Sequence, residues 1–373
     1  FRYPSSETYK SPDGSRAMLM TVDKTLTVLW LGCVVWIMCW VDSCVMGWFT
    51  GYGYHMWATA AAVYLGCASI KVDVRGKTVL ITGCDSGFGL NVAKHLHTLG
   101  FQVVAGCLLA DKNGEGAEEL RKIGSERLHI IQLDITKEDQ INKAFEDVKK
   151  LIPDGKLWGL LNNAGYATLG FAEWLPIEDT RKNLEVNVVG LISMTKTFLP
   201  LIRNAKGRIV NVASVIGRCS CPMFSTYSMT KHAVEGYSDS LRLEMKSWGV
   251  KVCMIEPGNY SSGTNFLSAA GLKSWQESLW KSASDEVKSV YGQNSIDAFM
   301  NFFEGMRGAA RQDVSAVVNA MTEALTQKFP QARYMPQDPG SRFVATLSTH
   351  FPEFLYDLII MKGYKDTGFD FQK

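Results

Sequence analysis

Residues 78–89 read TVLITGCDSGFG, an apolar run that leads directly into a cluster of glycines. The apolar half is typical of a buried β-strand, and residues 90–99 have the spacing of a helix. Gly83, Gly87 and Gly89 let the backbone turn tightly and approach a pyrophosphate at the helix N-terminus, where amide groups and the helix dipole attract anions. A glycine cluster alone is weak evidence in a chain with 33 glycines. Its position between a strand and a helix makes it a specific indication of a dinucleotide site.

Short apolar runs alternate with amphipathic stretches of helical length through the rest of the chain. Six of these runs are typical of strands, at residues 78–82, 102–107, 128–133, 157–161, 208–212 and 250–255. Such alternation indicates parallel strands connected by helices, and nearly continuous apolar strands are expected when both faces of the sheet are covered. We therefore predict one α/β domain over residues 71–373, a Rossmann-type doubly wound parallel sheet of about seven strands.

The segment ahead of this domain has a different composition. Residues 1–24 are polar, whereas residues 25–70 carry a single formal charge, Asp42. The first apolar part, residues 25–41, is near the lower length limit for a helix that crosses a bilayer. The second part, residues 43–70, is interrupted by glycines and aromatics that suit a membrane interface. We predict that residues 25–70 insert into a lipid bilayer as one or two transmembrane helices.

Two other interpretations of this segment stay open. A secretory signal peptide normally begins with a short basic segment, and 24 polar residues precede the apolar part here. A buried soluble helix would need a large partner surface. Lys and Arg flank the segment on both sides, so the basic-residue bias does not fix a topology. We expect the endoplasmic reticulum rather than the mitochondrial inner membrane. Because the sequence starts at Phe1, a preceding segment is left open.

Polar side chains follow the later strands of the predicted sheet, at the edge where a doubly wound fold binds its ligand. Asp134 follows the third strand, where its carboxylate suits a hydrogen bond from adenine, and residues 162–165 (NNAG) close the fourth. Ser214 follows the fifth strand. Tyr227 and Lys231 are four residues apart, so on a helix they share one face.

In this order the motifs resemble those of the short-chain dehydrogenase/reductase family. The resemblance rests on TGCDSGFG, NNAG, Asn187, Ser214, the Tyr227/Lys231 pair and residues 257–258 (PG). The segments GCDSGFG, AKHLHTLGF, AGCL, LPLIRNAKGR and EPGNY are similar to a branch that contains D-β-hydroxybutyrate dehydrogenase, retinol dehydrogenases and 17β-hydroxysteroid dehydrogenase type 2. The resemblance implies an oxidoreductase that interconverts an alcohol and a carbonyl with a nicotinamide nucleotide.

The resemblance also implies the roles of individual residues. Tyr227 would be the general acid/base, Lys231 would supply positive charge and hold the nicotinamide ribose, Ser214 would bind the substrate oxygen, and Asn187 would anchor a water. A phenol with a pKa near 10 is a poor base at neutral pH, so Tyr227 needs the nearby positive charge. The predicted cofactor-binding residues are Gly83, Asp85, Ser86, Gly87, Phe88, Gly89, Asp134, Ile135, Asn163, Ala164, Gly165, Tyr227, Lys231, Pro257, Gly258 and Ser262.

The end of the second strand usually discriminates NAD from NADP, because an acidic residue there accepts the ribose hydroxyls. Here the expected position falls near Cys107, so the usual discriminator is missing. Ser86 brings no positive charge for a 2′-phosphate. We therefore favour NAD, although Lys112 leaves NADP open.

The substrate pocket is predicted from the segment between Ser214 and Tyr227 and from residues 259–311, an aromatic-rich stretch that we expect to form a lid. Met223 and Phe224 favour an apolar substrate. A hydroxy acid would need a cation opposite its carboxylate, and Arg218 is the cation of this segment. The apolar stretch at residues 343–361 fits either a membrane surface or a cap on the pocket.

Other function classes are less well supported. With 39 basic and 37 acidic side chains there is no concentrated charge for nucleic acid. We expect no metal site, since Cys219 and Cys221 have no second cysteine pair near them. The leading hypothesis is a membrane-bound, NAD-dependent enzyme for a steroid- or retinoid-like secondary alcohol. The alternatives are a 3-hydroxybutyrate dehydrogenase and a non-catalytic, nucleotide-sensing membrane scaffold. A homo-oligomer is left open.

Overall fold

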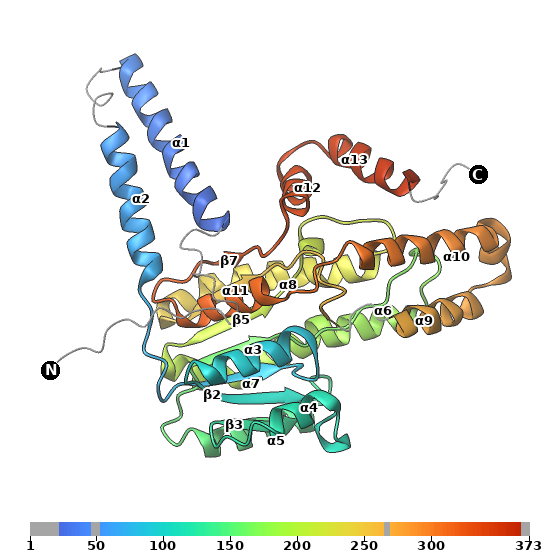
Figure 1. Cartoon of the computed structure of the whole chain (residues 1–373), viewed down its shortest axis with the longest axis horizontal. Helices are drawn as coiled ribbons and strands as arrows, with labels where there is room; N and C mark the ends of the chain where they lie inside the picture. The colour runs from blue at the N-terminus through green and yellow to red at the C-terminus, as the bar shows by residue number, and fades with distance from the viewer. Residues whose placement is uncertain (1–21, 46–52, 265–268, 367–373) are drawn as a thin grey trace. The chain divides into compact units, whose positions relative to one another are not determined.

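A computed structural model describes residues 22–45, 53–264 and 269–366 of the 373 residues (Figure 1). The chain divides into two compact units. One comprises residues 1–71 with 327–329, and the other residues 72–326 with 330–373. The two units are described separately.

The first unit contains two apolar helices, α1 (Val22–Val45) and α2 (Gly53–Ser69). They run antiparallel in a hairpin. Trp57 of α2 donates a hydrogen bond from Nε1 to the carbonyl oxygen of Val28, at 2.9 Å. The helices approach closely where Gly32 faces Trp57, because a Cβ at Gly32 would lie 3.0 Å from the indole nitrogen. Small residues at such crossings are typical of helices that pack in membranes.

The outer faces of these helices expose large apolar side chains. Trp30 is 64% exposed, Trp36 is 68% exposed and Val63 is 60% exposed. Among the described residues, the stretch that is long and apolar enough to cross a membrane is Ile177–Ala205, with 44% of its apolar window buried. That stretch belongs to the second unit, where it packs as a core helix. Lys24–Trp40 is apolar but shorter.

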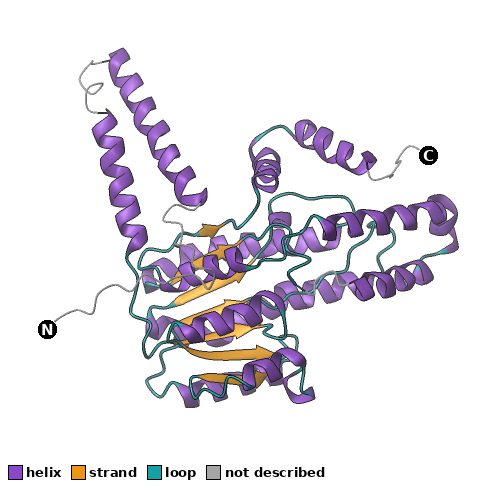
Figure 2. Ribbon diagram, in the orientation of Figure 1, coloured by secondary structure: helices purple, strands orange, loops and turns teal. Residues whose placement is uncertain are grey.

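The second unit is a parallel sheet of seven strands in the order β3-β2-β1-β4-β5-β6-β7. The strands are β1 (Thr78–Thr82), β2 (Gln102–Cys107), β3 (Leu128–Gln132), β4 (Gly159–Asn162), β5 (Arg208–Val212), β6 (Lys251–Ile255) and β7 (Arg333–Tyr334). The predicted Rossmann-type fold is confirmed. Strands β1, β2, β4, β5 and β6 are almost entirely buried because helices cover both faces, as Figure 2 shows, whereas β3 is mostly half-buried.

Helices cover the sheet in two layers. One layer contains α3 (Gly87–Thr98), α4 (Glu115–Arg121) and α11 (Ser315–Thr326). The opposite layer contains α5 (Glu138–Leu151), α7 (Leu191–Ala205) and α8 (Ser225–Glu244). The remaining helices are α6 (Ile177–Leu184), α9 (Ala269–Ser282), α10 (Asp285–Gly308), α12 (Pro339–His350) and α13 (Glu353–Asp366), with the short turns η1 (Ala110–Lys112), η2 (Glu185–Gly190), η3 (Val215–Gly217) and η4 (Met245–Trp248).

The sheet reverses its winding at β1, which pairs with β2 on one side and β4 on the other. In such folds the crevice at the carboxyl ends of the strands, at this reversal, is the ligand site. The chain therefore places the residues that follow β1, β3, β4, β5 and β6 around a single crevice.

The last strand, β7, lies at the edge of the sheet and was not predicted. It is held by Arg333, whose guanidinium binds Glu235, Asp239 and Glu256, the last at 2.7 Å. Glu256 is fully buried and directly follows β6, whereas Glu235 and Asp239 belong to α8, so the guanidinium joins β7 to both elements. This cluster fixes the strand that precedes α12.

Candidate active site

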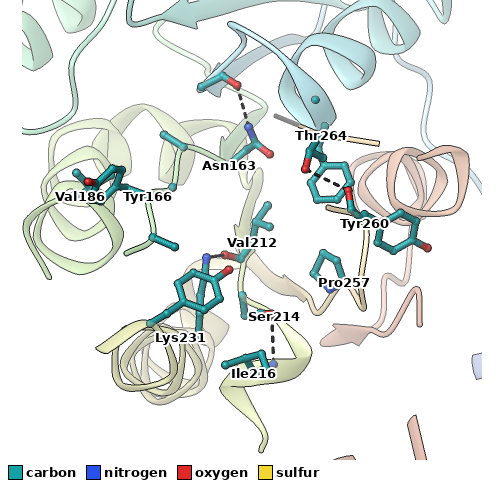
Figure 3. Close-up of a pocket in the computed structure, with 18 of the residues that line it drawn as sticks. Asn163, Tyr166, Val186, Val212, Ser214, Ile216, Lys231, Pro257, Tyr260 and Thr264 are labelled. Carbon is teal, nitrogen blue, oxygen red and sulfur yellow. Dashed lines mark hydrogen bonds between the residues drawn. The ribbon is translucent and has the colours of Figure 1, made fainter. Parts of the chain in front are cut away.

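A cavity of about 1270 Å³ opens at the carboxyl ends of the strands. It exceeds the ~300–1,000 Å³ that is typical of small-molecule pockets, which suits a dinucleotide together with a second ligand. Residues after β1, β3, β4, β5 and β6 line it, joined by Met306 of α10 and Ser341 of α12. Figure 3 shows part of this lining.

The glycine loop forms the floor of the cavity. Gly83 and Gly87 have positive φ angles of 71° and 57°, which L side chains rarely adopt. A Cβ at Gly89 would lie 2.1 Å from the carbonyl oxygen of Gly83, so only glycine fits there. Helix α3 begins at Gly87 with no acidic residue in its first turn, and Ser86 makes no capping hydrogen bond from its side chain. This helix N-terminus is therefore suited to a phosphate group, which it would bind through backbone amides.

The loop after β4 is fixed to the loop after β1. Thr82 accepts hydrogen bonds at its Oγ1 from the backbone N–H of Asn163 and Ala164, both at 3.0 Å. Asn163 donates from Nδ2 to the carbonyl oxygens of Thr82 and Gly83, at 2.9 and 3.1 Å. These bonds position Ala164 and Gly165 in the cavity wall.

The predicted adenine side also lines the cavity. Asp134, Ile135 and Val186 of η2 all lie in its wall. The carboxylate of Asp134 accepts hydrogen bonds from the N–H and hydroxyl of Thr136, at 2.9 and 2.7 Å. Both bonds end on Oδ1, so Oδ2 is placed to accept a hydrogen bond from an amino group.

Ser214, Tyr227 and Lys231 meet at the opposite end of the cavity. Ser214 has an extended backbone and accepts a hydrogen bond from the N–H of Ile216, at 3.2 Å, which orients its hydroxyl. Lys231 lies one turn after Tyr227 on α8, and its Nζ lies 5.6 Å from the Tyr227 ring centroid. The same Nζ donates to the carbonyl oxygen of Val212 at 2.9 Å (Figure 3). The three groups surround the point where an alcohol or carbonyl oxygen would bind.

Burial dominates the titration of this group. It raises the pKa of Tyr227 to about 12, and the hydrogen bond with Ser214 only partly opposes this rise. Burial also lowers the pKa of Lys231 to about 8, while the negative charge of Glu235 opposes that decrease. Without a bound cationic ring, the phenol is therefore protonated at neutral pH. The direction is opposite to the one expected from the sequence, where Lys231 favours the phenolate, because desolvation of the buried phenol dominates its pKa.

Asn187 lies behind the wall, in the π-helical turn η2. Its Oδ1 accepts from the N–H of Tyr166 at 2.8 Å. Its Nδ2 donates to the carbonyl oxygen of Tyr166 at 2.7 Å and to Oγ1 of Thr230 at 3.0 Å. Both amide protons are used, so the side chain links the loop after β4 to helix α8. A π-turn often marks a functional position in a helix.

Five predicted site residues do not line the cavity: Gly89, Asn187, Arg218, Met223 and Ser262. Arg218 acts on Glu235, where its positive charge opposes the rise that burial causes in the pKa of that carboxyl group. Met223 has a φ of 68° and packs into the core beneath α9 and α10. Ser262 donates its hydroxyl to the carbonyl oxygen of Arg307, and the neighbouring Ser261 and Thr264 face the cavity instead. Phe224 does line the cavity.

The aromatic residues of the segment at 259–311 pack mainly against one another. Phe299 and Phe303 are fully buried, with ring centroids 4.7 Å apart, and Trp275 packs on Phe299 at 5.7 Å. Helices α9 and α10 are thus joined by an aromatic core. Among the described residues of α9 and α10, the one that lines the cavity is Met306, at the C-terminal end of α10.

The C-terminal helix α13 holds the loop between Ser214 and Tyr227. Tyr356 donates its hydroxyl to the carbonyl oxygen of Ser220, and Tyr364 donates to that of Pro222 at 2.7 Å. Tyr364 also stacks on Phe302 of α10, with centroids 4.8 Å apart. The apolar segment at residues 343–361 therefore covers the loop, while the opposite face of α13 exposes Phe354 and Leu358.

Several lining residues were not anticipated. They are Leu108, Thr136, Tyr166, Ala167, Arg181, Lys182, Val186, Ile216, Ser261, Thr264, Met306 and Ser341, among others. Some had a usable signal. Leu108 directly follows the second strand, and residues that follow a strand at this edge face the crevice. Met306 lies in the segment at 259–311 that was predicted to cover the pocket. Ser341 had no signal, because only the tertiary fold brings a residue so distant in the chain to this edge.

The chain is similar to several known proteins. The family model described as short chain dehydrogenase matches residues 77–271. Rat mitochondrial D-beta-hydroxybutyrate dehydrogenase is 42% identical over 286 residues, which cover 76% of this chain and 83% of the rat protein. Mouse retinol dehydrogenase 7 is 40% identical, covering 77% and 88% of the two chains. Bovine 17-beta-hydroxysteroid dehydrogenase type 6 is 39% identical, covering 78% and 90%.

Solved structures share the fold. A short chain dehydrogenase/reductase from Burkholderia phymatum in complex with NAD has a TM-score of 0.60 at 23% identity, covering 74% of this chain and 94% of its own. A short chain dehydrogenase from Burkholderia cenocepacia in complex with NADP has a TM-score of 0.57 at 20% identity, covering 78% and 99%. With the sequence relatives and the cavity, the conclusion is direct: this chain belongs to the short-chain dehydrogenase family and is an oxidoreductase that acts on CH–OH groups with a nicotinamide nucleotide.

Proposed function

We propose that the protein interconverts a hydrophobic secondary alcohol, steroid- or retinoid-like, and its ketone with NAD(H). The observation that carries this proposal is the composition of the cavity around Tyr227. Ile216, Phe224 and Met306 supply apolar side chains there. The cations that line the cavity within the described residues are Arg181, Lys182 and Lys231, and the last is committed to Val212.

The glycine loop, the N-terminus of α3 and the wall formed by Asn163, Ala164 and Gly165 would hold the nicotinamide nucleotide. Their fit rests on the close approach at Gly89, where a Cβ would fill the space the backbone needs. When bound, the nucleotide supplies or accepts the hydride. Lys231 would hold its ribose, and Pro257 and Gly258 would border the ring.

The protein's own contribution is the movement of a proton at Tyr227 Oη. In reduction, the protonated phenol donates its proton to the oxygen that becomes the alcohol. In oxidation, the phenolate accepts it. Ser214 holds the substrate oxygen by a hydrogen bond, and Lys231 stabilises the phenolate by its charge. Asn187 fixes the loop and helix that position these groups, and we propose that a water bound beside it passes the proton to solvent.

A second candidate is 3-hydroxybutyrate as substrate, which the 42% identity to the rat hydroxybutyrate dehydrogenase favours. A bound carboxylate needs a cation, because an uncompensated charge would keep much of its desolvation cost. Arg218 does not provide it, and Arg181 and Lys182 of α6 are the remaining candidates in the lining. We rank the apolar substrate first because the residues beside Tyr227 are apolar.

We expect kcat/KM for a steroid or retinoid alcohol to exceed that for 3-hydroxybutyrate by more than tenfold. This ratio corresponds to about 1.4 kcal/mol of differential transition-state binding. Burial of one large apolar group supplies about 1.5–3 kcal/mol, which is sufficient. The measurement is NAD-dependent turnover of the detergent-solubilised protein with both substrate classes. A higher value for 3-hydroxybutyrate would reverse the ranking, and Arg181→Met and Lys182→Met would then identify its carboxylate site.

We also propose that α1 and α2 insert into a bilayer. At 1.5 Å per residue, the 24 residues of α1 extend about 36 Å, against a hydrocarbon core of about 30 Å. The 17 residues of α2 extend about 26 Å, so α2 would need its interfacial residues to complete a span. The exposed side chains of Trp30, Trp36 and Val63 support this proposal, since exposure of large apolar side chains to water is unfavourable.

The full chain should stay in the membrane pellet after a carbonate wash, because two inserted helices are held by apolar burial and not by charge. A variant that lacks residues 1–71 serves as a comparison and should lose most of this retention. Recovery of the full chain in the soluble fraction would contradict bilayer insertion. Fractionation of the same membranes also tests our proposal of the endoplasmic reticulum against the mitochondrial inner membrane.

A further inference from the structure

The carboxylate of Asp85 leaves the glycine loop and reaches the turn that follows β2. One oxygen accepts a hydrogen bond from the N–H of Leu108 at 2.8 Å, and the other accepts from the N–H of Leu109 at 2.9 Å. Asp85 and Leu108 both line the cavity. The sequence shows no acidic residue near Cys107, where the second strand ends, yet the fold delivers a carboxylate to that point.

This carboxylate is held in one position. The turn that binds it is fixed from the other side by Gln132, whose Nε2 donates to the carbonyl oxygen of Leu108 at 2.8 Å. Helix α4 packs directly on the Asp85 backbone, because a Cβ at Gly116 would lie 2.1 Å from the Asp85 carbonyl oxygen. Since both oxygens of Asp85 bind backbone amides, the side chain cannot turn away without leaving those amides unpaired.

Nearby cations do not offset its charge in the cavity. Of the described residues between 102 and 121, Leu108 alone lines the cavity. Lys112 is exposed, and Arg121 binds Glu118 and donates to the carbonyl oxygen of Ala110 at 2.9 Å. The end of β2 therefore presents negative charge to a ligand.

We propose that Asp85 is the residue that selects NAD over NADP. In doubly wound folds the adenosine ribose lies at the end of the second strand. The free lone pairs of Asp85 accept the 2′- and 3′-hydroxyl groups of NAD there, and its charge repels the 2′-phosphate of NADP. The acid thus comes from the glycine loop and not from the strand end. This inference rests on the proposed NAD(H)-dependent function.

The test is a binding titration of the full chain in detergent with NADH and with NADPH, in the absence of substrate. The fluorescence of the nucleotide reports binding. We expect the wild-type protein to bind NADH at least ~10-fold more tightly than NADPH, because a like charge placed beside the 2′-phosphate is strongly unfavourable. Asp85→Asn keeps the size of the side chain and removes its charge. It should reduce the NADH/NADPH preference by at least ~10-fold, mainly through tighter binding of NADPH.

Asp111→Asn is the matched control, since Asp111 is exposed, lies outside the cavity lining and carries the same charge. It should leave the preference unchanged. An unchanged preference in Asp85→Asn, or a wild-type protein that binds NADPH as tightly as NADH, overturns the proposal. The wild-type comparison decides even if the variant does not fold. Failure of the wild-type protein to bind either nucleotide would instead contradict the proposed function itself.

Discussion

Tyr227→Phe should reduce turnover by about 10²–10⁴-fold, while nucleotide affinity and thermal stability stay near the wild-type values. The phenyl ring keeps the volume that packs in the cavity wall, and only the hydroxyl that exchanges the proton is lost. Steady-state kinetics measure the first effect, and NADH titration and thermal unfolding measure the others. A variant with near-normal turnover would remove Tyr227 from the mechanism.

The control is Tyr237→Phe, the same substitution on the same helix at a residue outside the cavity lining, which should leave turnover within a fewfold of wild type. The pH profile adds a second criterion. With a Tyr227 pKa of about 12, the proton needed for reduction is lost only as pH rises through that value. The rate of reduction should therefore not change through titration of Tyr227 between pH 6 and 9. The rate of oxidation, which needs the phenolate, should increase with pH.

Gly89→Ala should abolish measurable nucleotide binding and destabilise the catalytic unit. The new Cβ would lie 2.1 Å from the carbonyl oxygen of Gly83 and 2.6 Å from Nδ2 of Asn163, so the loop or α3 must move. Overpacking of this kind typically costs about 1–3 kcal/mol. Thermal unfolding and NADH titration measure both consequences.

Gly236→Ala provides a control with the opposite sign. A Cβ at Gly236 meets no atom within 4 Å, and the residue lies within α8. Alanine there should stabilise the helix by about 0.5–1 kcal/mol with turnover unchanged. If Gly89→Ala and Gly236→Ala had the same effects on stability and nucleotide binding, the close backbone approach would not explain why residue 89 is a glycine.

Six of the seven strands could be predicted because each is a continuous apolar run bounded by turns. The boundaries of β1, β2 and β5 agree with the prediction, and β3, β4 and β6 differ by a residue or two. The two-residue strand β7 has no such pattern. It depends on the ion pairs of Arg333 with Glu235 and Glu256, which lie 98 and 77 positions earlier in the chain. Local sequence carries no signal for such a strand.

The candidate site divides in the same way. Residues that follow strands, such as Asp134, Asn163 and Ser214, could be placed because the strand ends share one edge. Whether other residues line the cavity depends on the conformation of the loops that carry them. Met223 packs into the core with α9 and α10, and the positive charge of Arg218 acts on the buried Glu235. The role proposed for Asp85 could not be read from sequence, since its hydrogen bonds join two loops more than twenty residues apart.

The two tyrosine hydroxyls of α13 have a consequence for synthesis of the chain. Tyr356 and the Ser220 carbonyl that it binds are 136 residues apart. At ~5–20 residues per second, the loop between Ser214 and Tyr227 leaves the ribosome about 7–27 s before its anchoring helix exists. During that interval the loop, with Phe224, lacks the cover that Phe303 of α10 and the tyrosines of α13 later supply. The nascent loop therefore offers a chaperone an apolar target, and a premature stop codon before residue 356 would leave the loop without both tyrosine anchors of α13.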